Sequence, residues 1–139
     1  MKKLYYTAFF YAILGLLSGL FYREITKQNH FTGNTVLADV HTHLLVLGFM
    51  FFLITLILCK QFGLHEIKSF GAWYLVYNLG LLITIGAMAT RGMLQINGGD
   101  ISFLPDIAGL GHGILSIGFV WLLVMLGQKM NPEKTAYQD

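Results

Sequence analysis

Charge and cysteine are scarce in this sequence. Charged residues make up 12% of the 139 residues, whereas soluble proteins carry roughly a quarter. The net charge of +2 comes from Lys and Arg near the ends of apolar runs, so no nucleic-acid surface is predicted. The single cysteine, Cys59, excludes a disulfide within the chain and carries no metal-binding motif.

Apolar residues are abundant instead. They reach 55% of the chain, with a mean hydropathy of +0.63, which indicates an integral membrane protein. A membrane-spanning helix needs about 20 apolar residues. Four runs meet this need, at residues 4–22, 40–59, 70–90 and 107–127, and a polar tail follows at 128–139. The first run is too long for a signal peptide's apolar segment. The sequence therefore predicts an all-α, polytopic membrane protein with one domain of four transmembrane helices.

The distribution of Lys and Arg predicts the orientation. One side of the membrane receives more of them: Lys2, Lys3, Lys60, Lys68, Lys129 and Lys134. The other side receives Arg23, Lys27 and Arg91. Because cytoplasmic segments are enriched in these residues, we expect both termini in the cytoplasm and a multi-pass protein in the cytoplasmic membrane.

Three histidines stand in or beside the apolar runs, where imidazole is unfavourable and therefore a candidate functional group. With the second and fourth spans running inward, His41 and His43 lie roughly 3–6 Å inward of Asp39. His112 lies about 9 Å inward of Asp106. All three are expected in the outer third of the bilayer, as candidate metal or cofactor ligands.

The spacing of the first two histidines limits what they can bind. Two residues along a helix turn the side chain by roughly 200°, so His41 and His43 point in nearly opposite directions. That opposes a tetrahedral site made by all three imidazoles. A b-type haem needs only one axial nitrogen from each side, so His112 and either His41 or His43 could be its ligands. Met50, Met88 and Met93 are weaker candidates for axial ligation.

Other residues could complete a haem site. Glycines permit close approach of a flat ring, and four lie near these histidines: Gly48, Gly109, Gly111 and Gly113. Arg23 and Arg91 end the first and third spans on the outer side, where they could pair with propionates or serve only as membrane anchors. The carboxylate of Asp39, one turn before His43, could fix the tautomer of that imidazole.

Two short motifs carry a resemblance. His41-Thr42-His43-Leu44 resembles the His-x-His of the haem-copper oxidase catalytic subunit, where the two imidazoles serve two haems on opposite faces. His112-Gly113 resembles the His-Gly that supplies the other ligand of that family's low-spin haem. The family arranges its helices in three arcs of four, which a homotrimer of a four-span chain would reproduce. Neither proline here follows a histidine, so the copper-binding His-Pro-Glu motif and oxygen reduction are not predicted.

The whole chain also resembles a family of small four-span bacterial membrane proteins that share the run from His41 to Gly48 and have no assigned activity. This resemblance implies a bacterial cytoplasmic membrane. The leading hypothesis is a haem b protein for electron transfer or haem handling, with a quinol or a redox protein as partner. The alternatives are a metal or proton transporter or channel subunit, and a structural accessory subunit. A second metal, and whether the protein is an enzyme, stay open.

Overall fold

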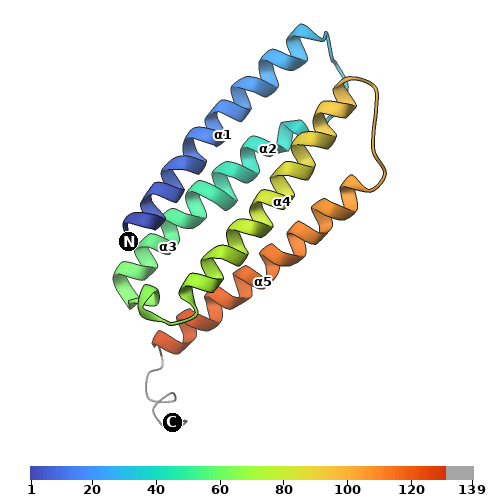
Figure 1. Cartoon of the computed structure of the whole chain (residues 1–139). Helices are drawn as coiled ribbons and strands as arrows, with labels where there is room; N and C mark the ends of the chain where they lie inside the picture. The colour runs from blue at the N-terminus through green and yellow to red at the C-terminus, as the bar shows by residue number, and fades with distance from the viewer. Residues whose placement is uncertain (131–139) are drawn as a thin grey trace.

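A computed structural model of the chain describes residues 1–130, and Figure 1 shows them as long antiparallel helices. The first is α1 (Lys2–Gln28). The second span is built from three consecutive pieces, α2 (Leu37–His43), the π-helix η1 (Leu44–Met50) and α3 (Phe51–Phe62). After the short η2 (Leu64–Glu66) come α4 (Phe70–Ile96) and α5 (Leu104–Met130). The prediction of an all-α chain with four helices long and apolar enough to span a membrane is confirmed.

The helices are longer than the predicted spans. The first continues to Gln28 rather than ending near residue 22, and the second span covers Leu37–Phe62 rather than 40–59. Polar residues at the ends of the apolar runs simply extend the same helices. Residues 128–130 of the predicted tail belong to α5, while residues 131–139, including Lys134, lie outside the described part.

The helices are neighbours in a simple order. The helix α1 packs on the second span, α2 packs on α4, and α4 packs most closely on α5 (Figure 1). Gly111 permits this closeness, because a Cβ there would lie 2.8 Å from the backbone nitrogen of Thr84. The start of α1 and the last turn of α5 lie at the same end of the bundle, which we call the inner end (Figure 1). The loops 29–36 and 97–103 lie at the opposite, outer end.

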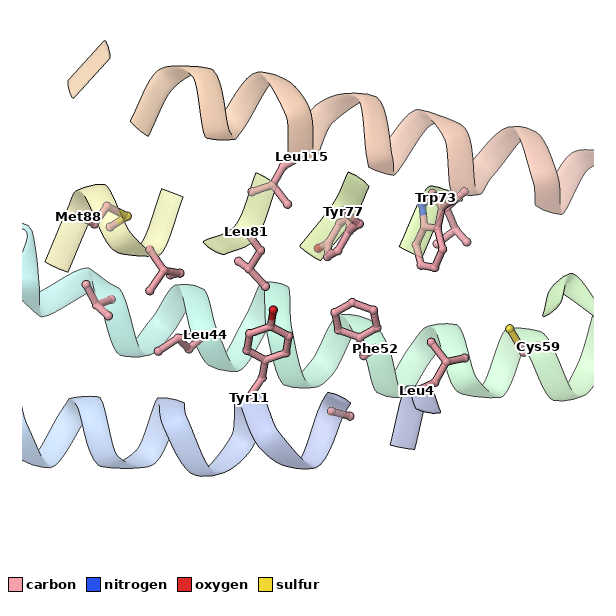
Figure 2. Packing of buried hydrophobic residues seen from close by; sticks show 14 of the residues in the cluster. Leu4, Tyr11, Leu44, Phe52, Cys59, Trp73, Tyr77, Leu81, Met88 and Leu115 are labelled. Carbon is pink, nitrogen blue, oxygen red and sulfur yellow. The ribbon is translucent and has the colours of Figure 1, made fainter. Parts of the chain in front are cut away.

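An aromatic core fills the inner half of the bundle (Figure 2). Phe51 stacks on Tyr77 with ring centroids 4.2 Å apart, and Phe52 stacks on Tyr11 at 5.8 Å. Trp73 is fully buried, and its Nε1 donates a hydrogen bond of 2.8 Å to the carbonyl of Gly118 in α5. These contacts tie all four spans together at one level and leave the outer half to smaller side chains.

Candidate functional site

Two of the predicted histidines meet in the outer half of the bundle. His43 ends α2 and His112 lies in the third turn of α5, and their ring centroids are 6.0 Å apart with planes at 87°. The two helices flank α4, so the imidazoles approach each other across its surface. His43 is half-buried and His112 is exposed at the side of the bundle. The structure thus selects His43, and not His41, as the neighbour of His112.

Each of these imidazoles is oriented by its own helix. Nδ1 of His43 lies 2.9 Å from the main-chain carbonyl oxygen of Asp39, and Nδ1 of His112 lies 2.8 Å from that of Ala108. A carbonyl oxygen can only accept, so both Nδ1 atoms carry a hydrogen, and in the neutral form of each ring Nε2 is the nitrogen with the lone pair. Within residues 1–130 no hydrogen bond engages either Nε2. The predicted role of Asp39 is therefore filled by its main chain rather than its carboxylate.

Both histidines line a pocket of about 420 Å³. Ala87 and Met88 of α4, which are buried, and Gly109 of α5 line the same pocket. These side chains are apolar or absent, which leaves a hollow beside the two imidazoles. Met88, a weaker candidate for axial ligation, lies in this pocket, and Ala87 is a lining residue that has no signal in the sequence.

Arg91 lines the same pocket on its outer side, and it is paired. Its Nε and Nη2 donate to the two carboxylate oxygens of Asp100, at 3.0 and 2.8 Å. The guanidinium hydrogen bond holds the pKa of the Asp100 carboxyl below its usual range. The pair connects the loop 97–103 to the end of α4 and keeps the guanidinium of Arg91 at the pocket.

His41 lies on the other side of the second span, against α1. A Cβ at Gly19 would lie 3.6 Å from its ring, its Nδ1 is buried without a hydrogen bond, and its Nε2 is 3.3 Å from the hydroxyl of Thr42. The three histidines are therefore not brought together. In the described part of the chain, no group of three or more His, Cys, Asp or Glu side chains could hold a metal ion.

Several other predicted site residues lie away from the pocket. Arg23 is 75% exposed at the end of α1, beside Glu24 at 4.0 Å. Gly48 faces α1, where a Cβ would lie 2.6 Å from Cγ of Tyr11. Gly113 borders open space, so a Cβ there would meet nothing within 4 Å. With Gly111 packed on α4, Gly109 is the one predicted glycine that lines this pocket. The prediction that the four glycines together form one slot for a flat ring is therefore wrong for this pocket.

The π-helix η1 explains how His43 reaches its place. The buried residues of the second span recur every fourth position, at Val40, Leu44, Gly48 and Phe52. Three steps of four residues overshoot three α-helical turns by about 120°. The wider turns of a π-helix absorb that excess, so α2 and α3 bury the same side. Tyr77 supports the wide turn by donating a 3.0 Å hydrogen bond to the carbonyl of Leu47.

Comparison with known families identifies one match. The family model described as "Protein of unknown function (DUF2871)" matches residues 1–129. The chain belongs to the DUF2871 family. No curated protein and no solved structure matches it. The prediction of a family without an assigned activity is confirmed, while nothing in these comparisons supports the resemblance to the haem-copper oxidase subunit.

The site in this DUF2871 protein offers a specific chemistry. In their neutral form, the two imidazoles with hydrogen-bonded Nδ1 atoms present a lone pair on Nε2, which is a common metal-ligating atom. Hydrogen bonds from Nδ1 to carbonyl oxygens are the usual support of ligating histidines, since they set the ring orientation and raise its basicity. Arg91 adds a cation beside an otherwise apolar pocket.

Proposed function

We propose that this DUF2871 protein binds b-type haem in the outer half of the bundle, with His43 and His112 as its two axial ligands. The observation that carries the proposal is the 6.0 Å separation of the two ring centroids. Imidazole nitrogens bind metals at about 2.0–2.1 Å. Adding the ring radii, two imidazoles on opposite sides of one ion have centroids roughly 6 Å apart.

The number of protein ligands favours haem over a bare ion. A structural zinc ion takes about four protein ligands, and a catalytic zinc ion about three. The pocket supplies two imidazoles, and residues 1–130 bring no third His, Cys, Asp or Glu into such a group. A haem brings four nitrogens of its own and takes one or two axial ligands from the protein.

The pocket also suits a flat amphipathic group. Its volume of about 420 Å³ falls in the range of about 300–1,000 Å³ usual for cofactor sites. Ala87 and Met88 offer an apolar floor, and Arg91 lies at the outer side, where acidic propionates would face the membrane surface. Arg91 would then bind a propionate in addition to, or in exchange for, Asp100.

The expected role is electron transfer. When bound, a haem with two axial imidazoles would supply one-electron exchange at an iron whose axial positions are both taken. His43 and His112 would hold the iron, the carbonyls of Asp39 and Ala108 keep the two rings oriented, and the apolar side chain of Met88 would help to exclude water from the site. The homotrimer and a quinol or redox-protein partner stay predictions that accompany this proposal.

An optical spectrum of the purified protein tests it. The full chain is expressed with added haem precursor, purified in detergent and measured reduced minus oxidised. We expect a Soret band and a sharp α-band in the wild type, and loss of most bound haem in His43→Ala and in His112→Ala. His41→Ala is the matched control, because His41 faces α1, and it should keep its haem. A wild type without a Soret band, or equal loss in all three variants, overturns the proposal.

A further inference from the structure

A second pocket lies at the other end of the molecule, between α1 and α4. Its volume is about 520 Å³, and it extends from Lys3 at the inner end to Phe10 and Leu82 deeper in the bundle. Tyr6, Phe10 and Leu82 are exposed at the side of the bundle, so the pocket opens where lipid would lie. It shares no residue with the histidine pocket.

Polar side chains line this pocket, and most of them already form hydrogen bonds with one another or with the main chain. The hydroxyl of Tyr11 donates to Oδ1 of Asn78 at 2.8 Å, and Thr7 and Tyr74 share a hydrogen bond between their hydroxyls. Nδ2 of Asn78 donates one hydrogen to the carbonyl of Tyr74. Its second N–H and the hydroxyl of Tyr6 make no hydrogen bond within residues 1–130. The pocket therefore offers donors to whatever fills it.

The charged side chain that lines this pocket is that of Lys3, which is positive. The ammonium nitrogen of Lys3 lies 3.9 Å from the ring centroid of Tyr74, and within the described residues it makes no ion pair. No carboxylate lines the pocket. From Lys3 to Tyr11 the helix rises about 12 Å, so the cation and the Asn78 amide stand at different depths. An occupant that satisfies both needs a negative group at the surface and acceptors farther in.

We propose that this pocket binds an anionic glycerophospholipid of the leaflet at the inner end. Its phosphate would pair with Lys3, and its ester carbonyls would accept hydrogen bonds from Tyr6 or Asn78. An acyl chain would follow Phe10 and Leu82 into the bilayer. A free phosphate ion matches only the Lys3 end, because the deeper part of the pocket is apolar. This proposal does not depend on haem binding.

Native mass spectrometry of the detergent-purified full chain tests the proposal. Phosphatidylglycerol and phosphatidylcholine with identical acyl chains are added at equal concentration, and the retained lipid is counted. We expect several-fold more phosphatidylglycerol on the wild type. Lys3→Gln should reduce this excess to the level of phosphatidylcholine. Lys2→Gln is the matched control, because it removes the same charge from the neighbouring position, which does not line the pocket.

A second pair of variants tests the pocket rather than its charge. Leu82→Trp fills the apolar part and should reduce retention of phosphatidylglycerol, whereas Leu79→Trp, on the same helix and outside the pocket, should not. Both leucines are exposed, at 52% and 55%, so the fold should accept either change. Equal retention of the two lipids by the wild type, or equal effects of Lys2→Gln and Lys3→Gln, overturns the proposal.

Discussion

The inner and outer halves of this bundle use the same helices in opposite ways. In the inner half, Phe51, Trp73 and Tyr77 pack ring against ring, and the buried polar atoms of Trp73 and Tyr77 are hydrogen-bonded to carbonyl oxygens. In the outer half, His43 and His112 leave their Nε2 atoms unbonded beside a pocket of about 420 Å³. A satisfied, close-packed region provides rigidity, and an unsatisfied, hollow one provides a place to bind.

The difference follows from side-chain size along α4 and α5. Large rings of α4 fill the inner half, whereas Ala87, Ala108 and Gly109 line the outer pocket. The π-helix η1 joins the two regions, because Tyr77 of the aromatic core bonds its Leu47 carbonyl while His43 directly precedes it. Packing in one half therefore sets the direction of a candidate ligand in the other. The following experiments test this division.

The largest effect on stability is expected in the aromatic core. Trp73→Ala removes a fully buried ring and its hydrogen bond to Gly118, which should lower the free energy of unfolding by about 3–5 kcal/mol. Titration with a denaturing detergent measures this value. The control is Leu75→Ala, since Leu75 is 65% exposed on the same helix and its truncation should have little effect. Similar losses in both variants would contradict the assignment of stability to this core.

Lengthening the π-helix should separate the two histidines. Insertion of one alanine after Val46, which is 53% exposed, adds a residue that the existing wide turns do not absorb. The insertion should turn α2 by about 100° relative to α3. The readout is a short thiol crosslinker in a His43→Cys, His112→Cys chain whose buried Cys59 is replaced by Ala. We expect efficient crosslinking without the insertion and little with it.

The control for that experiment is Val46→Ala, which keeps the number of residues and should keep the crosslink. Persistent crosslinking after the insertion would show that the π-helix does not direct His43. Because this readout needs no cofactor, it separates the geometry of the site from the haem proposal.

A smaller effect is expected at Gly48. Gly48→Ala places a Cβ 2.6 Å from Cγ of Tyr11, so α1 must shift and the free energy of unfolding should fall by about 1–3 kcal/mol. The haem spectrum should be retained, because Gly48 does not line the pocket. Gly113 borders open space, so Gly113→Ala should change neither the free energy of unfolding nor the haem spectrum. If Gly48→Ala loses haem but keeps its stability, the conclusion that Gly48 lies outside the haem site is wrong.

The smallest effect concerns the pair of Arg91 and Asp100. Since Arg91 lowers the pKa of Asp100 in the folded protein, the unfolded chain binds this proton more readily. The pair therefore stabilises the fold at pH values above the ordinary carboxyl pKa, and that contribution disappears as the pH falls through the lowered one. Stability measured against pH should show a shallower acid decline in Asp100→Asn than in the wild type, because the variant lacks the carboxyl whose pKa Arg91 lowers. An equally steep acid decline in Asp100→Asn and in the wild type would contradict this prediction.

Sequence reasoning recovered the fold because four long apolar runs have few structural alternatives in a membrane. It also anticipated that His41 and His43 point apart, because that follows from the residues per turn. It could not choose between them, since the choice depends on how α2 sits on α4. The π-helix was missed, although burial every fourth residue left a trace in Val40, Leu44, Gly48 and Phe52. Because the π-helix was not predicted, Gly48 was assigned to the haem site, whereas it packs against Tyr11 of α1.

The most direct test of the central proposal is electron paramagnetic resonance of the oxidised, haem-loaded protein. Two axial imidazoles whose planes stand at 87° should give a low-spin ferric signal of the strongly anisotropic type typical of perpendicular ligands. That signal should disappear in His43→Ala and in His112→Ala and persist in His41→Ala. A high-spin signal in the wild type, or a low-spin signal that survives replacement of either ligand, would contradict ligation by this pair.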